Sequence, residues 1–226
     1  MSRKMIYKIV VDCMMTVLLL LLMAYSLIGE ALHEWIGVGM LILFILHHVL
    51  NGSWYKNLMK GRYSPYRILQ TVLAFLILFT MFGSMVSGIV MSDYVFDFLP
   101  VSGGQALAQS LHLPCAYWGF LLMSIHLGLH WGMLMNVMNR MTGLRQSHLR
   151  TIALRVLAVL FAACGLLAFF RNDLPAYLLM RTHFVFLDFE RPLILFFLDY
   201  LAIMGLFVWA GYYGGKGLLA WNKRRR

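Results

Sequence analysis

Histidines are the residues of this 226-residue chain best suited to chemistry, and most of them fall in two apolar stretches. Six of the eight lie in or at the ends of these stretches: His33, His47, His48, His112, His126 and His130. Ionisable side chains inside a bilayer are rare and usually functional. These six imidazoles are therefore the candidate ligands of a metal or cofactor.

The spacing of the histidines arranges them in two matched sets. His47 follows His33 by 14 residues, and His126 follows His112 by the same interval. On an α-helix such residues share one face, about 40° apart around the axis and about 21 Å apart along it. Because a hydrocarbon core is about 30 Å thick, each helix would hold one histidine near each membrane surface.

One return segment separates the two histidine helices, so they should run parallel. His33 would then lie near His112 at the outer surface, and His47 near His126 at the inner surface. Two facing imidazoles can ligate one iron porphyrin from both sides, and helix bundles commonly hold such groups. The spacing therefore predicts two non-covalent haem b groups. Because bis-histidine ligation leaves no open iron position, it favours electron transfer over oxygen activation.

The choice of inner ligands stays open at this point. His48 lies 15 residues after His33, on the other side of the axis, and His130 lies near the depth of the lipid headgroups. We predict His47 and His126 as the iron ligands. His48 and His130 would then support these ligands or contact a quinone.

Other chemistry must be weighed against haem. Zinc prefers four clustered ligands, which histidines about 21 Å apart on one helix cannot supply, although His126 and His130 could contribute two. A histidine-lined metal or proton transporter, or a membrane-anchor subunit without haem, is the alternative function. The apolar stretches contain two carboxylates, Asp12 and Asp199.

Both carboxylates have simpler structural interpretations. Lys8 precedes Asp12 by one turn, so a local ion pair is expected. Asp199 lies inside the last apolar stretch, where an unpaired charge is costly. It would be protonated, pair with a residue such as Arg191, or take part in proton release beside a quinone.

The elements that position these residues follow from composition. Hydrophobic residues make up 62% of the chain and charged residues 12%, about half the charge of a typical soluble domain. This excludes a soluble enzyme and a disordered chain. Six stretches are long enough to cross a bilayer as helices: Ile9–Ile28, His33–Leu50, Ile68–Met91, Leu113–Met138, Ile152–Phe170 and Leu193–Tyr213. We expect an all-α integral membrane bundle of six transmembrane helices, with a four-helix di-haem core, surrounded by membrane lipid.

The basic residues indicate orientation. Net charge is +10, and sixteen of the 19 lysines and arginines fall on one side of the expected spans. This asymmetry follows the positive-inside rule, so both termini are expected in the cytoplasm. Since the basic residues lie in short loops between apolar runs, no nucleic-acid partner is expected.

Two parts are expected along the chain. Residues 1–138 would form the four-helix haem-binding core, and residues 139–226 would add two transmembrane helices joined by an outer interfacial segment. In that segment, Pro175 would begin a short helix, and Arg181 and His183 would face water beside Phe184 and Phe186.

Short motifs around the histidines resemble known cytochromes. The two helices with paired histidines resemble the haem-bearing four-helix core of cytochrome b in respiratory bc complexes. A closer resemblance is to an uncharacterised family of bacterial di-haem b-type membrane cytochromes, which is associated with flavin-carrying extracytoplasmic proteins. The motifs that carry it are His33-Glu34-Trp35, His47-His48-x-x-Asn51, His126-x-x-x-His130-Trp131, Asp188-Phe189-Glu190-Arg191-Pro192 and Asp199-Tyr200.

This resemblance implies a place and a role. The chain would lie in a bacterial cytoplasmic membrane and pass electrons between membrane quinol and an extracytoplasmic electron-transfer protein. If it is an enzyme, it would be a subunit of a quinol-dependent oxidoreductase. Only four ligand positions carry over, His33, His47, His112 and His126. The further quinone-site loops and partner domains of the bc type are missing, so a bc-type mechanism does not transfer.

Overall fold

The computed structural model describes residues 3–99, 101, 103–143, 147–182 and 192–224. Within them, all regular structure is helical, and six helices are long and apolar enough to cross a membrane. These six are α1 (Arg3–Leu22), α3 (Glu30–Leu50), α5 (Pro65–Val90), α6 (Gln105–Thr142), α7 (His148–Arg171) and α9 (Leu193–Arg224). The expected all-α membrane bundle of six spans is therefore confirmed.

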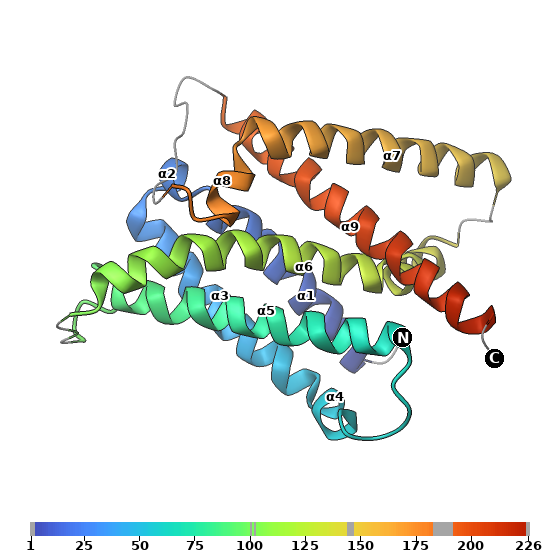
Figure 1. Ribbon diagram of the computed structural model, residues 1–226, viewed down its shortest axis with the longest axis horizontal. Helices are drawn as coiled ribbons and strands as arrows, with labels where there is room; N and C mark the ends of the chain where they lie inside the picture. The colour runs from blue at the N-terminus through green and yellow to red at the C-terminus, as the bar shows by residue number, and fades with distance from the viewer. Residues whose placement is uncertain (1–2, 100, 102, 144–146, 183–191, 225–226) are drawn as a thin grey trace.

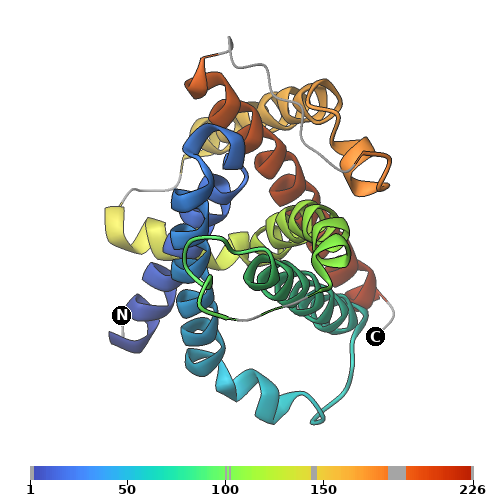
Figure 2. The same ribbon diagram turned by 90° about the vertical axis from the view of Figure 1, so that its left-hand side faces the viewer.

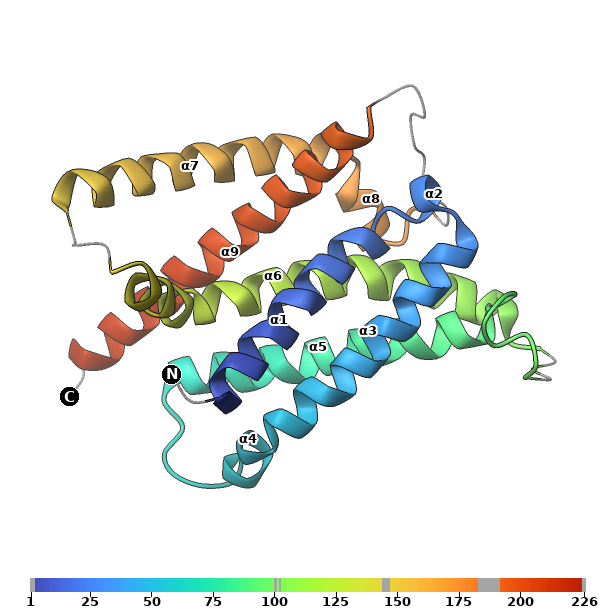
Figure 3. The ribbon, with the colours of Figure 1, turned by 180° about the vertical axis from the view of Figure 1, so that it is seen from behind.

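Three short helices connect the long ones: α2 (Tyr25–Ile28), α4 (Gly52–Asn57) and α8 (Leu174–Leu178). Figure 1 shows α2 and α8 at one end of the bundle and α4 at the other. The start of α1, the end of α6, the start of α7 and the end of α9 lie at the end that holds α4 (Figures 1 and 3). The two chain ends therefore lie on one side of the bundle, as an even number of spans requires.

The long helices form three antiparallel pairs. α1 packs against α3, α5 against α6, and α7 against α9 (Figure 2). α6 also packs closely against α9, so the second and third pairs are joined. The α1–α3 pair makes fewer close contacts with the other helices. α6 therefore packs both on α5, from the expected first part of the chain, and on α9, from the expected second part. The division of the chain at residue 138 stays a prediction.

Several helix ends differ from the expected spans. The stretch Ile9–Ile28 is not one helix, because α1 ends at Leu22 and the separate helix α2 follows. α2 ends at Ile28 and is followed by Gly29, whose φ of 84° lies in the left-handed region that glycine tolerates best. This turn lets α3 begin at Glu30, so that His33 lies in the first turns of a new helix.

α6 is much longer than the stretch Leu113–Met138. It begins at Gln105 and continues through His112 and Pro114 to Thr142. A proline inside a helix removes one backbone hydrogen bond, but it is tolerated within a bundle. As a result, His112 lies well inside α6 rather than at its end.

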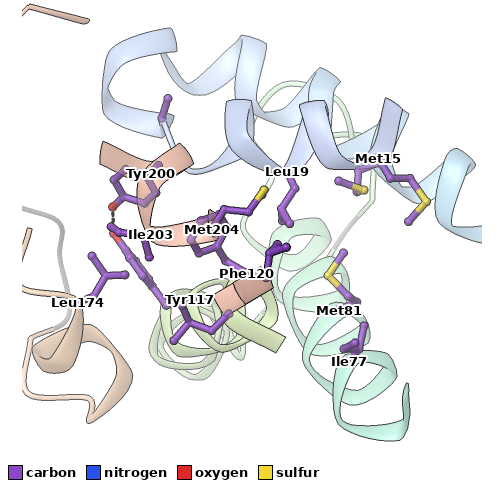
Figure 4. Packing of buried hydrophobic residues seen from close by; sticks show 14 of the residues in the cluster. Met15, Leu19, Ile77, Met81, Tyr117, Phe120, Leu174, Tyr200, Ile203 and Met204 are labelled. Carbon is purple, nitrogen blue, oxygen red and sulfur yellow. Dashed lines mark hydrogen bonds between the residues drawn. The ribbon is translucent and has the colours of Figure 1, made fainter. Parts of the chain in front are cut away.

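The buried core lies where the three pairs meet. Phe120 of α6 and Ile203 of α9 are fully buried, and Leu19 of α1 is nearly so. Figure 4 shows these side chains together with Met204, and shows the hydroxyls of Tyr117 and Tyr200 joined by a hydrogen bond. The outward faces of the helices are apolar as well: Val49, for example, is 71% exposed. An apolar core with an apolar exterior is the arrangement of a multi-pass membrane protein.

The outer connection between α7 and α9 is described only in part. The short helix α8 includes Pro175 in its first turn, as expected. The indole nitrogen of Trp118 donates to the carbonyl oxygen of Leu178 at 3.0 Å, which fixes α8 against α6. The expected positions of His183, Phe184 and Phe186 lie outside the described residues.

Glycines set the close approach of α6 to α9. A Cβ added at Gly128 would collide with the carbonyl oxygen of Val208, and one at Gly211 would collide with that of Ile125. Gly128 therefore lets the backbone of α9 contact α6, and Gly211 lets the backbone of α6 contact α9. Small residues at such contacts are typical of membrane helix packing.

We expect Gly128→Ala to destabilise the bundle, because the added methyl group forces the α6 and α9 backbones apart. Overpacking of this kind costs about 1–3 kcal/mol, which should appear as a lower thermal unfolding temperature in detergent. Gly132→Ala is the matched control, since its nearest neighbour would be Tyr212 Cε2 at 3.9 Å. Equal melting temperatures for the two variants would contradict this packing role.

Candidate functional site

Two histidines from different helices meet near the outer end of the bundle. The ring centres of His33 on α3 and His112 on α6 lie 6.1 Å apart, with an angle of 68° between the ring planes. Both rings line a cavity of about 530 Å³ between the α1–α3 and α5–α6 pairs. Gly37, Gly88 and Tyr117 are among the other lining residues. The volume is within the range of about 300–1,000 Å³ usual for ligand sites.

The His112 ring is held by α5. Its Nδ1 lies 3.0 Å from the Ser87 hydroxyl. The ring also packs on Gly88, where an added Cβ would lie 3.4 Å from its Cε1 atom. The hydroxyl of Ser87 and the absence of a side chain at Gly88 therefore hold the His112 ring in place, and Nε2 is the ring nitrogen without this hydrogen bond. No sequence pattern singled out Ser87.

His33 is held differently. Its Nδ1 atom is buried without a hydrogen-bond partner. Tyr25 of α2 packs edge-on against the ring, with 5.1 Å between ring centres. Burial raises the pKa of the Tyr25 hydroxyl, and the nearby Glu30 and Glu34 raise it further. Tyr25 is therefore a neutral neighbour at this end of the cavity.

Glu34 organises the loop that follows α5. Its carboxylate accepts hydrogen bonds from the Ser92 hydroxyl at 2.6 Å and from three backbone amides. These amides belong to Asp93, Tyr94 and Val95. One carboxylate thus ties the outer loop to the helix of His33, a role that the His33-Glu34-Trp35 motif did not reveal.

We expect Glu34→Ala to release this loop, because four donors lose their acceptor at once. Hydrogen–deuterium exchange in the segment 92–96 should become faster. Glu30→Ala is the control, because Glu30 is exposed and the described residues provide it with no hydrogen bond to lose. Unchanged exchange in Glu34→Ala would show that the loop is held by other contacts.

A second group of polar residues lies toward the inner end. Nδ1 of His47 lies 2.7 Å from Oδ1 of Asp12, which joins α3 to α1. Lys8 Nζ donates to Asn51 Oδ1 at 2.7 Å, and Asn51 Nδ2 donates to the backbone oxygen of His47 at 2.9 Å. The expected pair of Lys8 with Asp12 is therefore wrong. Both residues instead bond across to α3, because α1 and α3 pack side by side.

His126 and His130 of α6 belong to the same inner region. Their ring centres lie 4.7 Å apart, and Nδ1 of His126 is buried without a hydrogen-bond partner. Asp12 and His47 are close enough to act electrostatically on both rings. In the described part of the chain, His47 and His126 nevertheless make no direct ring contact like that of the outer pair.

His48 points elsewhere. Its Nδ1 lies 2.6 Å from the Tyr55 hydroxyl, and its ring packs edge-on against Phe44 at 4.3 Å. Burial raises the pKa of Tyr55, so this hydroxyl keeps its proton and can donate to His48. Nε2 of His48 is buried and has no partner. His48 is thus bonded to α4, whereas His47 is bonded to Asp12 of α1.

Asp199 belongs to a separate polar group at the outer end of α9. Its carboxylate accepts from Arg171, and from Asn172 Nδ2 at 2.9 Å. The buried charge is therefore paired, as one of the sequence interpretations held, and the partner is Arg171. Arg191, the expected partner, lies outside the described residues. The neighbouring Tyr200 hydroxyl lies 3.1 Å from that of Tyr117.

Among the described residues, no three histidine, cysteine, aspartate or glutamate side chains are arranged to hold one metal ion. The site therefore consists of an outer histidine pair beside a cavity and an inner histidine group joined to Asp12. Comparisons with protein-family models, curated proteins and solved structures find no match for this chain.

Proposed function

We propose that this protein is a di-haem b-type cytochrome that transfers electrons across a bacterial cytoplasmic membrane. The observation that carries the proposal is the outer pair, His33 and His112. Metal–nitrogen bonds to histidine are about 2 Å long, so two histidines on opposite sides of one metal have ring centres roughly 6 Å apart. The observed separation is 6.1 Å.

The residues around the outer pair fit a porphyrin. The cavity beside the rings is lined mainly by apolar side chains of α1, α3, α5 and α6. The Ser87 hydroxyl occupies Nδ1 of His112. Ligating histidines usually engage their second nitrogen with such a partner, which fixes the ring orientation. His33 and His112 would hold this haem.

The inner residues support a second haem by the same chemistry. Asp12 bonds to Nδ1 of His47, and the nearest hydrogen-bonding group to Nε2 is the Asn51 amide, whose Nδ2 lies 3.5 Å away. Nε2 would be the nitrogen that binds a metal. On α6, the buried and unpartnered Nδ1 of His126 marks a polar group in need of a partner. We assign His47 and His126 as the inner ligands, with His130 and His48 beside them.

A haem bound at each position supplies one-electron redox chemistry. His33, His112, His47 and His126 would hold the two haems at two depths of the bundle. Asp12 and Ser87 bond to Nδ1 of His47 and of His112, and so orient these two rings. With a histidine from each of two helices bound to the iron, each haem would have no open position for oxygen or substrate.

A quinone site is part of the proposal. A second cavity, of about 570 Å³, lies beside α4 and the start of α5. Trp54 and polar side chains including Asn57, Gln70 and Thr71 line it. Trp54 packs on Tyr55 with 5.0 Å between ring centres, and Tyr55 contacts His48. An aromatic face with several hydrogen-bonding groups suits the ring and carbonyl oxygens of a quinone. The resemblance suggests an extracytoplasmic electron-transfer protein as the other partner.

Haem content tests the proposal directly. Purified protein should show b-type bands in reduced-minus-oxidised spectra, with about two haems per chain by pyridine extraction. His112→Ala should lose one haem and keep the other, since it removes an axial ligand from the outer pair only. His126→Ala should lose the inner haem instead.

His148→Ala is the control for this experiment, because His148 is an exposed residue at the start of α7. It should keep both haems. Circular dichroism would show that each variant is folded. Wild-type protein without haem would refute the proposal and favour the transporter or anchor alternative.

We also propose that the end of the bundle holding α4 and both chain ends faces the cytoplasm. Most of the lysines and arginines fall in the sequence segments that belong to that end, and the positive-inside rule places such segments in the cytoplasm. Alkaline phosphatase is active only after export, so a fusion at Asp97 should be active and a fusion at Lys60 inactive. The reverse pattern would invert the orientation.

A further inference from the structure

The two histidine groups differ in the chemistry of their hydrogen-bond partners. At the outer pair, Nδ1 of His112 faces the neutral hydroxyl of Ser87 at 3.0 Å. At the inner group, Nδ1 of His47 faces the Asp12 carboxylate at 2.7 Å. One imidazole is therefore bonded to a neutral group and the other to a group that carries negative charge when ionised.

The shorter of these bonds has a defined direction. An ionised carboxylate has no hydrogen to donate, so Nδ1 of His47 donates to Asp12. This selects the tautomer whose Nε2 carries a lone pair. A carboxylate partner also increases the basicity of a ligating histidine more than a neutral partner does. A more basic ligand beside a negative charge stabilises ferric iron relative to ferrous iron, and hydrogen bonds and charge of this kind set haem potentials.

Asp12 forms no ion pair with Lys8, the cation nearest to it in the sequence. Lys8 is one turn earlier on α1, but its Nζ donates to Asn51 Oδ1. Asn51 in turn bonds to the backbone oxygen of His47. The other titratable groups that interact with this cluster are the α6 histidines, His126 and His130. Lys8 and Asn51 thus hold the end of α3 in place and leave the Asp12 carboxylate to His47.

We propose that Asp12 is a positioning residue for the inner haem: its carboxylate orients His47 and lowers the reduction potential of that haem alone. The inference rests on the proposed di-haem function. It adds a residue from α1, a helix without histidines, to the electron-transfer site. It also explains why α1 and α3 are joined by polar contacts at the inner end.

The test is a spectroelectrochemical titration of purified haem-loaded Asp12→Asn protein. Asparagine keeps the size of the side chain and removes the charge. One of the two haem transitions should move to a higher potential. We expect its redox equilibrium constant to change by up to about tenfold, which corresponds to about 59 mV for a one-electron couple. The other transition should stay in place.

Two further variants separate charge from packing. Asp12→Glu retains a carboxylate and should leave the inner transition closer to wild type than Asp12→Asn does. Ser87→Ala removes the partner of His112 and should affect the outer transition instead. Electron paramagnetic resonance should show the same division, with one of two low-spin ferric signals changed in each variant.

Each outcome bears on the inference. Loss of one haem from Asp12→Asn but not from Asp12→Glu supports it, because the carboxylate is then needed to hold His47. Two haems with unchanged potentials in Asp12→Asn would overturn it and leave the di-haem function intact. Equal shifts or equal haem loss in both Asp12 variants would also overturn it, since the effect would not follow the carboxylate. Absence of haem from the wild type would refute the proposed function itself.

Discussion

The arrangement of this protein depends on the cost of leaving imidazole nitrogens unsatisfied in an apolar bundle. Three histidines have a partner for Nδ1 from a nearby element: His112 has Ser87 of α5, His47 has Asp12 of α1, and His48 has Tyr55 of α4. Nδ1 of His33, Nδ1 of His126 and Nε2 of His48 remain without partners. His33 lines the outer cavity, where we propose a porphyrin because the histidine spacing favours one.

The helix pairs differ in how closely they pack against one another. α5, α6, α7 and α9 are drawn together by small residues, as where Gly165 of α7 meets the backbone of Ala202 on α9. The α1–α3 pair instead approaches its neighbours less closely and encloses the cavity that His33 and His112 line. Close packing on one side and a cavity on the other are what a bundle needs to hold a large flat group without losing its shape.

Sequence periodicity predicted much of this organisation. The membrane class, the six spans and the parallel course of the two histidine helices follow from composition and spacing, because apolar length and helical geometry are local properties. The break after Leu22, the passage of α6 through Pro114 and the partners of Asp12 and Lys8 did not follow. Each of these depends on a contact with another helix, which no local pattern encodes.

By itself, the sequence determined the fold class and the candidate ligands, since a 14-residue interval places two imidazoles on one face of any α-helix. Only the tertiary structure decided which rings meet. It brings the ring centre of His33 to 6.1 Å from that of His112, and it bonds His48 to Tyr55 of α4. It also pairs Asp12 with His47 rather than with Lys8. The reason is that rotation of a helix about its axis, and the choice among nearby polar partners, are set by packing against the neighbouring helices.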